Sequence, residues 1–170
     1  MRRENYMDRA SAREIQKNLL YNLLFYQIFM TAEEYNQRYA FFHDITGRAM
    51  EVHSEYHGGL LESAYEAALC YLLMQKGYHV ERQVFLPIYW KDVKLEQNYR
   101  MDLVVNHDII IELKAITFTG IEHRKQLWNY MNLTHLPYGM LINFSPRGLY
   151  SEWYHRHENG EIEQIKIRKD

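Results

Sequence analysis

Two neighbouring apolar segments carry charged residues whose types and spacing could do chemistry together. Asp102 lies in the segment YRMDLVV, and Glu112 and Lys114 lie in the next segment, IIIELKA. If residues 106–108 form a three-residue turn, the segments pair as a β-hairpin with Asp102 directly opposite Glu112, their Cβ atoms about 4.5–5.5 Å apart. Two carboxylates at this separation can share a divalent cation. The spacing therefore predicts a metal site on one face of the hairpin.

Such a site has a physical use in cleaving phosphodiester bonds. Two acidic side chains can hold Mg²⁺ or Mn²⁺, and the Leu113 carbonyl is a candidate further ligand. The ion polarises the phosphate and lowers the pKa of a bound water. Lys114 could orient that water or stabilise charge in the transition state, and no nucleophilic side chain is needed. The pattern Asp…Glu-x-Lys is therefore consistent with metal-assisted hydrolysis of a phosphodiester bond.

The alternative interpretation is an amphipathic hairpin whose polar face is only a solvated set of salt bridges, with Arg100 opposite Lys114. Two aliphatic residues, Val104 and Ile110, share that polar face, which indicates that a further element covers part of it. The opposite face would be apolar throughout, and a two-residue turn would mix the two faces, so the pattern favours the three-residue turn. The predicted apolar face consists of Met101, Leu103, Val105, Ile109, Ile111 and Leu113.

Hydrophobic periodicity predicts the elements that position this hairpin. After two helices, the predicted order is helix, three strands, helix, strand, which is a mixed α/β fold. The predicted helices cover about 11–30, 31–53, 60–75 and 122–133, and the predicted strands cover 79–90, 99–105, 109–115 and 138–144. A charged turn is expected between the first two strands. Pro87 argues for an edge position of the first strand.

The composition limits the classes of function. The chain has 170 residues, of which 47% are hydrophobic and 25% charged, as in a soluble packed domain. The formal net charge of −2 excludes broad electrostatic capture of nucleic acid, so such a partner needs a local patch or a bound cation. The single cysteine, Cys70, excludes a disulfide framework and multi-cysteine metal sites, and we expect a reducing, cytoplasmic location.

The N-terminal segment is predicted to be a helical extension, residues 1–40, that precedes a domain at 41–170. Charges alternate in its first residues, which does not favour a secretory signal. Its longest apolar stretch, Leu19–Met30, is interrupted by Asn22 and Gln27 and is shorter than the roughly 20 residues of a membrane span. We therefore expect no membrane association. The same stretch could bury itself in a homodimer or against another partner.

The segment Gly59-Leu60-Leu61-Glu62-Ser63-Ala64-Tyr65 matches the motif that names the GxxExxY proteins of the PD-(D/E)XK nuclease superfamily. The similarity continues in the order and spacing of that family and covers roughly residues 42–145. The further matching segments are Arg82-Gln83, Tyr99–Leu103, Ile111–Ala115, Gln126–Tyr130 and Leu141–Phe144. The chain therefore resembles the GxxExxY family.

The resemblance implies a restriction-endonuclease-like core, which is a mixed β-sheet flanked by helices. In that core Asp102, Glu112 and Lys114 take the Asp, Glu and Lys positions of the superfamily. Glu62 takes the position of the extra helical acid that often joins the metal site. The resemblance thus makes Glu62 a candidate metal ligand and catalytic residue.

Gln126 and Tyr130, one turn apart on the predicted helix, resemble the Gln-x-x-x-Tyr element found near the substrate in RecB-like members. Together with Arg100 they are the candidate substrate-binding residues. The sequence departs from the expected pattern at two places. Met101 stands where the superfamily name has proline, and His57-Gly58 stands where Gly-Pro is expected before the motif.

Each residue assigned from the resemblance also has a structural interpretation. Glu62 could be a first-turn acid that complements the helix dipole. Tyr65 falls on the apolar stripe of its helix, which favours a place in the core over a catalytic role. Gln126 and Tyr130 could be an exposed polar pair, because a neighbouring face of the same helix competes with theirs for the core.

We therefore expect a metal-dependent, nuclease-like protein that uses Mg²⁺ or Mn²⁺ to hydrolyse phosphodiester bonds of nucleic acid, with DNA favoured over RNA. Asp102, Glu112, Leu113 and Glu62 are the expected metal ligands, and Lys114 serves the chemistry. The alternative is a non-catalytic nucleic-acid-binding or protein-interaction module that retains the nuclease fold. The near-neutral charge and the aromatic N-terminal segment favour this module, whereas the intact set of acids and lysine favours the nuclease.

Overall fold

The computed structural model describes residue 33 and residues 36–166. The chain divides into two compact units, residues 1–43 and 44–170, and the candidate site residues all belong to the second. In the first unit, residues 36–43 are helical. The predicted helix at 11–30, with the dimer contact expected of it, and the predicted helix start at 31 lie outside the described residues. Within the described chain, no helix is long and apolar enough to cross a membrane.

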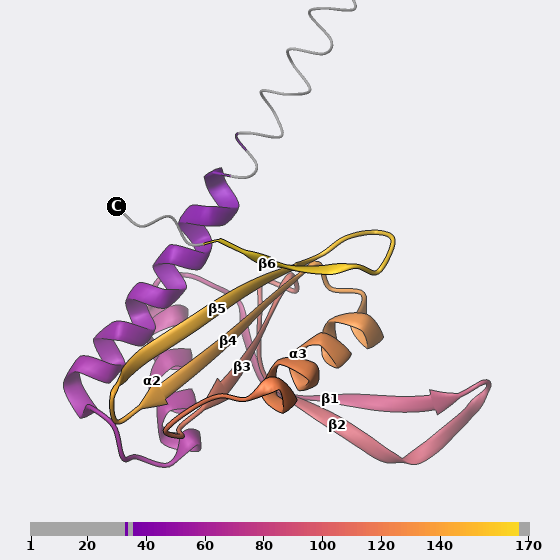
Figure 1. The fold of residues 1–170 in the computed structure, drawn as a ribbon, viewed down its shortest axis with the longest axis horizontal. Helices are drawn as coiled ribbons and strands as arrows, with labels where there is room; N and C mark the ends of the chain where they lie inside the picture. Colours follow the sequence, from indigo (N-terminus) through magenta and orange to yellow (C-terminus); the bar gives the residue numbers. More distant parts are fainter. Residues whose placement is uncertain (1–32, 34–35, 167–170) are drawn as a thin grey trace, which may run out of the picture. The chain divides into compact units, whose positions relative to one another are not determined.

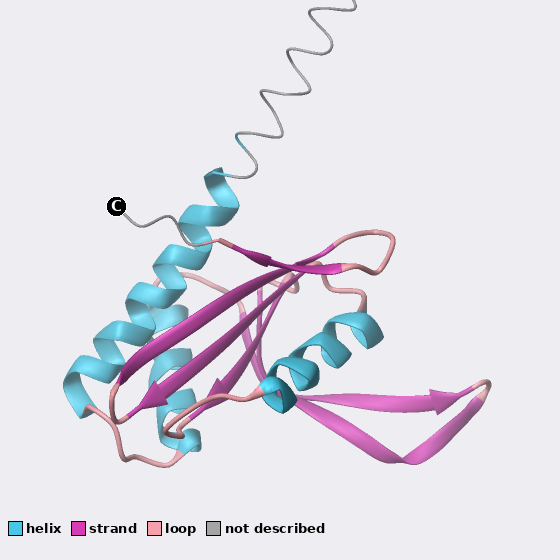
Figure 2. Cartoon of the chain, in the orientation of Figure 1, coloured by secondary structure: helices cyan, strands magenta, loops and turns pink. Residues whose placement is uncertain are grey.

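The second unit is built on a six-stranded mixed β-sheet, counted over its described residues (Figures 1 and 2). In spatial order the strands are β1 (Val80–Trp90), β2 (Val93–Val105), β3 (Ile109–Lys114), β4 (Tyr138–Ser145), β5 (Gly148–Arg156) and β6 (Ile162–Ile165). Helices are formed by residues 44–56, α2 (Glu62–Gln75) and α3 (Ile121–Thr134). All neighbouring strands are antiparallel except β3 and β4, which are parallel because α3 provides the crossover between them. This architecture confirms the predicted mixed α/β fold with a sheet flanked by helices.

Different helices cover the two faces of the sheet. On one face, Tyr65 of α2 stacks on Phe144 of β4, with ring centroids 4.4 Å apart. Leu141 points to the opposite face because its position in β4 differs from that of Phe144 by an odd number of residues. There it belongs to a buried cluster with residues of α3 and the β2–β3 hairpin. That cluster includes Val104, Ile110, Leu127, Tyr130, Met131 and Leu141.

The β2–β3 hairpin has the predicted register. Its turn comprises residues 106–108, and the paired residues are Val105 with Ile109, Val104 with Ile110, and Leu103 with Ile111. Every residue of the predicted apolar face is buried, from Met101 to Leu113. The assignment of Met101 to that face is wrong, because Met101 packs with Val104 and Ile110 in the cluster under α3. Val104 and Ile110 are buried as well, because α3 covers the part of the polar face on which they lie. The requirement for a covering element is therefore met by α3.

Two parts of the sheet differ from the prediction. Residues 93–98, expected as part of a charged turn, extend β2 along β1, and the chain turns instead at 91–92. These strand residues are exposed on both faces, so no alternation of polar and apolar residues marks them. Strands β5 and β6 also complete the core, and Trp153 of β5 is almost fully buried. The charged Glu152 interrupts the apolar pattern of β5, but its carboxylate is paired with Arg124 of α3 at 2.5 Å.

Pro87 and Gly77 take the positions that their backbone chemistry predicts. β1 is an edge strand, and its pairing with β2 shifts register between Pro87 and Tyr89. α2 is capped by Lys76 and is followed by Gly77, whose φ of 86° lies in the left-handed region that favours glycine. Gly77 therefore marks the end of α2, and Pro87 lies on an edge strand next to an irregularity in its pairing.

Candidate active site

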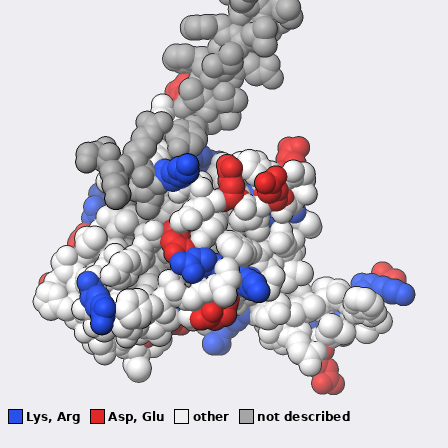
Figure 3. Space-filling view, viewed as in Figure 1, with Lys and Arg blue, Asp and Glu red and all other residues white. Residues whose placement is uncertain are grey.

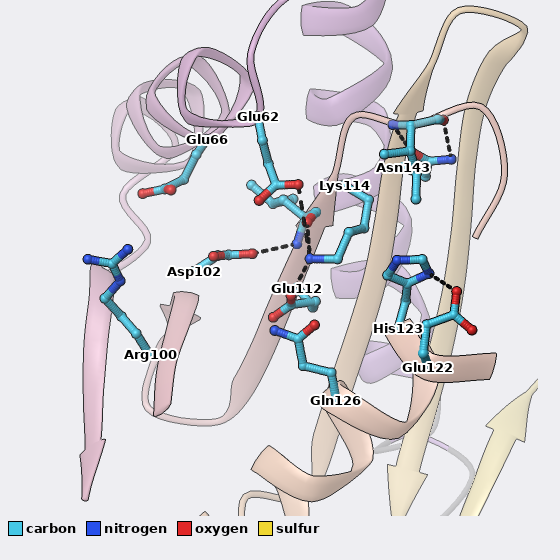
Figure 4. A network of polar contacts seen from close by, with 12 residues as sticks. Glu62, Glu66, Arg100, Asp102, Glu112, Lys114, Glu122, His123, Gln126 and Asn143 are labelled. Carbon is cyan, nitrogen blue, oxygen red and sulfur yellow. Dashed lines mark hydrogen bonds and ion pairs between the residues drawn. The ribbon is translucent and has the colours of Figure 1, made fainter. Parts of the chain in front are cut away.

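Asp102, Glu112 and Lys114 come together at the end of β3 (Figure 4). Lys114 Nζ donates hydrogen bonds to Glu112 Oε1 at 2.5 Å and to the Leu113 carbonyl at 2.9 Å. Asp102 Oδ2 accepts a hydrogen bond from the Leu113 N–H at 2.8 Å. Glu62, in the first turn of α2, places its Oε2 4.0 Å from Lys114 Nζ. Three carboxyl groups and one ammonium group therefore lie together, and we refer to the three acids as the acid cluster.

The acid cluster lies where β2 and β3 separate. The backbone pairing of the two strands ends one residue before Asp102 and Glu112. At this point the side chain of Asp102, rather than the backbone of β2, accepts the N–H of Leu113. The predicted pairing of Arg100 with Lys114 does not form, and Figure 4 shows Arg100 on the far side of Asp102 from Lys114. The two strands therefore separate at the acid cluster, where the side chain of Asp102 takes the place of a backbone acceptor.

Glu112 is the most deeply buried acid of the cluster, with 1% of its surface exposed. Burial raises the pKa of Glu112 to about 7; the charge of Asp102 acts in the same direction, and Lys114 opposes it. Glu112 Oε1 is bonded to Lys114, but Oε2 is buried and has no hydrogen-bond partner in the part of the chain that the structure describes. A buried carboxylate oxygen without a partner is costly unless another group satisfies it.

The other two acids of the cluster also resist ionisation. Burial raises the pKa of Asp102, and the hydrogen bond from Leu113 and the charge of Lys114 oppose this rise. Burial likewise raises the pKa of Glu62, with Lys114 opposing the rise and Asp102 adding to it. If all three carboxyl groups are ionised, their negative charge exceeds the single positive charge of the Lys114 ammonium group. Because hard divalent cations prefer oxygen ligands, the residues present fit Mg²⁺ or Mn²⁺.

Tyr65 fixes the loop from which Glu62 enters the site. The Tyr65 side chain is fully buried. Its hydroxyl donates a hydrogen bond to the His57 carbonyl at 2.7 Å and accepts one from the Leu60 N–H at 3.2 Å. Tyr65 therefore has the core position that its place on the apolar stripe predicted, and it holds the start of α2 in place.

Two glycines permit the tight course of this loop. A Cβ atom on Gly58 would lie 2.2 Å from the Cα of Pro146, a distance that the two backbones could not tolerate. Gly59 has a φ of 119°, a conformation that other residues rarely adopt. The segment that enters α2 therefore requires glycine at both positions, for two different reasons.

A second polar group, which sequence analysis missed, adjoins Asp102. Glu66 is 3% exposed, and its carboxylate accepts hydrogen bonds from Arg82 Nε at 2.8 Å and from Gln83 Nε2. Gln83 also hydrogen bonds to Asp102, which opposes the rise in pKa that burial causes there. The available signal was the spacing of Glu62 and Glu66, since residues four apart share one face of a helix.

Gln83 reaches both carboxylates from an unusual backbone conformation. Its φ is 51°, in the left-handed region, and β1 pairs with β2 on either side of Gln83 but not at Gln83 itself. A non-glycine residue in this region costs of the order of 1 kcal/mol or more, and such residues cluster at functional sites. The strained backbone thus directs an amide to the edge of the acid cluster.

Gln126 and Tyr130 share one face of α3 and are bonded to each other. Gln126 Nε2 donates a hydrogen bond to the Tyr130 hydroxyl at 2.8 Å, and that hydroxyl donates to the Arg100 carbonyl at 3.3 Å. Tyr130 is buried, so it is a core residue that fastens β2 just before Asp102. Gln126 is half-buried, and Figure 4 shows its amide beside Glu112. Of this pair, only Gln126 is partly exposed beside the acid cluster.

Asn143 of β4 holds the segment that follows Lys114. Asn143 Oδ1 accepts from the Ile116 N–H at 3.1 Å, and its Nδ2 donates to the Ile116 carbonyl at 2.9 Å. Ser145 Oγ donates to the Thr117 carbonyl at 3.1 Å. The end of β3 is therefore fixed on both sides, by Asp102 at Leu113 and by Asn143 beyond Lys114.

Outside the acid cluster, two groups in the described chain bring three ligand atoms within 4.8 Å of one another, but their donors differ from those of the acid cluster. Histidine nitrogens suit zinc and related transition metals better than magnesium. The groups are His79, Glu81 and His107, and His155, His157 and Glu163. Neither includes a residue of the acid cluster.

Comparison with known proteins places the chain in a broad class. Residues 39–156 match the family described as the PD-(D/E)XK nuclease superfamily. No curated protein matches the chain. A solved structure titled "Crystal structure of SSO0001" is similar to 54% of this chain, with 21% sequence identity and a TM-score of 0.45. The chain covers 48% of the length of that protein.

Proposed function

Because the chain belongs to the PD-(D/E)XK nuclease superfamily, we propose that it is a metal-dependent nuclease that hydrolyses phosphodiester bonds in DNA in preference to RNA. The observation that carries the proposal is the buried Glu112 Oε2, which has no hydrogen-bond partner among the described residues. Asp102 and Lys114 adjoin this carboxylate. A divalent cation would satisfy the oxygen and favour the ionised form of the acids, opposing the rise in pKa that burial causes.

Asp102 and Glu112 would hold Mg²⁺ or Mn²⁺, with Glu62 and the Leu113 carbonyl as further ligands. Bound there, the ion would polarise the scissile phosphate and lower the pKa of a coordinated water. The Leu113 carbonyl accepts a hydrogen bond from Lys114 Nζ. A carbonyl oxygen has two acceptor sites, so Lys114 would either share this oxygen with the ion or move away from it.

Lys114 supplies the positive charge of the site. Its ammonium group has three donors, of which two are directed to Glu112 Oε1 and the Leu113 carbonyl. Turned toward a bound phosphate, the same group can orient the attacking water or stabilise the charge that develops in the transition state. Gln126 and the exposed Arg100 lie on either side of the acid cluster and are the proposed substrate contacts.

We also propose that the chain is a GxxExxY protein within this superfamily. Three positions of the motif have separate physical tasks that support the assignment. Gly59 provides the left-handed turn, Glu62 joins the acid cluster, and Tyr65 ties the loop to α2.

A cleavage assay tests the proposed activity. Purified protein is incubated with single-stranded DNA, duplex DNA and RNA, with Mg²⁺ or Mn²⁺ and with a chelator. We expect metal-dependent cleavage of DNA that is lost in Asp102→Asn and Lys114→Ala but retained in Glu158→Gln, a control for an exposed carboxylate. Thermal unfolding confirms that the variants are folded. Cleavage by Asp102→Asn at the rate of the unchanged protein would contradict the proposal.

The alternative is a non-catalytic nucleic-acid-binding or protein-interaction module. Large apolar side chains exposed near the β1–β2 turn, such as Trp90 at 68% and Val93 at 62%, favour it. Calorimetric titration with Mn²⁺ discriminates the two functions, because an acid cluster that only stabilises the fold would bind no ion. If Mn²⁺ gives no heat of binding, either alone or after DNA is added, the result would favour the non-catalytic module.

A further inference from the structure

Part of the β1–β2 hairpin extends beyond the rest of the sheet (Figure 1). We call residues 85–100 the arm. Its strand residues from 93 to 100 are all exposed, and several of its aromatic rings are exposed as well. Phe85 is 51% exposed and Tyr89 58% exposed. In Figure 3 the arm, at the lower right, has a mostly uncharged surface, with both Lys or Arg and Asp or Glu at its outer end and a further acid at its lower edge.

Two of these rings share one face of the arm with two cations. Phe85 pairs with Arg100 across the strands, and Tyr89 pairs with Lys94. Cross-strand partners point to the same side of a sheet. Lys94 Nζ lies 5.5 Å from the centre of the Phe85 ring, which places the two pairs on one side. We call these four residues the stacking face.

The stacking face leads to the acid cluster. Arg100 and Asp102 are two residues apart in β2, and Figure 4 shows their side chains next to each other. The path from Lys94 past Arg100 to Asp102 covers about 25 Å of strand. Arg100 forms no ion pair with any residue that the structure describes, so its charge is available to a ligand. Aromatic rings and cations therefore follow one another along a line that ends at Asp102.

We propose that the stacking face binds a single strand of DNA and guides it to the acid cluster. This inference rests on the proposed nuclease function and names the form of its substrate. Exposed aromatic rings stack on the flat faces of unpaired bases, and lysine and arginine neutralise the phosphates between them. In a duplex the base faces are covered by neighbouring bases, so a duplex could use the cations but not the rings.

The opposite face of the arm provides a contrast that favours nucleic acid over a protein partner. There Trp90 and Val93 form a cross-strand pair, and neither carries charge. An apolar pair of this kind fits a protein surface, whereas the stacking face alternates rings with cations. The arm also contains the acids Asp92 and Glu96 and the cation Lys91, so its attraction for phosphate is local and depends on Lys94 and Arg100.

A binding experiment separates this inference from the cleavage chemistry. The Asp102→Asn protein is titrated into a fluorescein-labelled oligodeoxythymidine of about 20 nucleotides, and the Kd is measured by fluorescence anisotropy. We expect Phe85→Ala and Tyr89→Ala, each added to Asp102→Asn, to raise the Kd about fivefold or more. Trp90→Ala, the matched control on the opposite face, should leave the Kd within about twofold.

The salt dependence of binding tests the cations of the stacking face. Lys94→Ala should reduce the slope of log Kd against log salt concentration by about 0.7, the value for one phosphate contact on a single strand. The unlabelled duplex should compete more weakly than the unlabelled single strand. Unchanged slopes in Lys94→Ala, or a duplex that competes as well as the single strand, would overturn the inference.

Other outcomes identify which proposal fails. If Phe85→Ala and Tyr89→Ala change the sedimentation of the protein but not its Kd for DNA, the stacking face is a protein contact and the inference is wrong. If cleavage is metal-dependent and lost in Asp102→Asn while both ring variants bind as the unchanged arm does, only the inference fails. If the ring variants lose binding but no cleavage occurs under any condition, the nuclease proposal fails and the strand-binding face is supported.

Discussion

The two halves of β2 have opposite environments. From residues 93 to 100 the strand is exposed on both sides, whereas from Met101 to Val105 it is almost entirely buried. The first half pairs only with β1, and the second half lies between β1 and β3. Asp102 is the first charged residue inside this boundary. The comparison shows that one strand can have two tasks. Residues 93–100 are open to a ligand, whereas the buried part holds the Asp102 carboxylate in the core.

Loss of a buried carboxylate should have the largest effect. Glu112→Gln is expected to lower the cleavage rate about a thousandfold or more, because it removes a charged ligand of the proposed ion. Glu96→Gln, a matched change on the exposed half of β2, should change the rate less than about twofold. The rates are measured with saturating Mg²⁺ on the same DNA. Similar losses in the two variants would show that burial does not select the functional acids.

The next largest effect should be the difference in stability lost when a side chain is shortened in the buried core and in the exposed half of β2. Ile111→Ala removes a side chain with no exposed surface and should lower the free energy of unfolding by about 2–5 kcal/mol. Val93→Ala, at an exposed position of β2, should lower it by less than about 1 kcal/mol. Urea denaturation measures both changes. Equal losses would indicate that the arm is buried against a partner in solution.

The metal-free protein should become more stable as the pH falls from about 8.5 to about 6. Burial raises the pKa of Glu112 from 4.5 to about 7, so the folded protein holds a proton here that the unfolded chain has released. This stabilisation is fully present below the unfolded pKa and is lost as the pH rises through about 7. The full effect is about 3 kcal/mol, at 1.36 kcal/mol for each pKa unit, and somewhat less than half of it falls between pH 8.5 and pH 6.

Thermal unfolding across this pH range measures the effect. Glu112→Gln is the control, since it cannot titrate and should show a flatter dependence. Mn²⁺ should reduce the dependence in the unchanged protein, because the ion replaces the proton on the carboxylate. A protein whose stability rises with pH in this range, without metal, would contradict the raised pKa.

The smallest effect should come from the bond that fastens β2 at the boundary. Tyr130→Phe removes the hydroxyl that bonds Gln126 and the Arg100 carbonyl and should cost about 1 kcal/mol of stability. Tyr99→Phe is the matched control, because the Tyr99 ring packs against Tyr130 and is itself 40% exposed. Its expected change is below about 0.5 kcal/mol. Equal losses would show that the hydroxyl of Tyr130 adds nothing to the anchoring of β2.

The register of the β2–β3 hairpin could be predicted because one face is wholly apolar. A slip by one residue would have exposed Ile111 and Leu113, so the pattern left one solution. The exposed half of β2 has no such constraint, and its residues 93–98 were expected to form part of a turn. The alternation of polar and apolar residues therefore predicts a strand that has one buried face. It does not predict a strand that is exposed to water on both faces.

Contacts between elements account for what the sequence did not reveal at the site. Glu66 and Gln83 meet only because α2 packs beside β1, and the contact depends on the left-handed backbone of Gln83. Neither feature has a local signature. Tyr130 was assigned to the substrate from the resemblance, but its depth of burial follows from the docking of α3 on the sheet. The sequence therefore predicted the acids and the lysine of the site, but not the contacts that hold them in place.

The hydrogen bonds of Lys114 imply competition for the acid cluster. Its ammonium group contacts Glu112 and approaches Glu62, the positions that the proposed ion would neutralise. Lys114 is thus a tethered counter-ion, and its charge opposes the binding of an entering metal. The substitution Lys114→Met should lower the Kd for Mn²⁺ measured by calorimetry, although the variant should no longer cleave DNA. Affinity for the ion and rate of reaction would then change in opposite directions, because one side chain both competes with the ion and serves the chemistry.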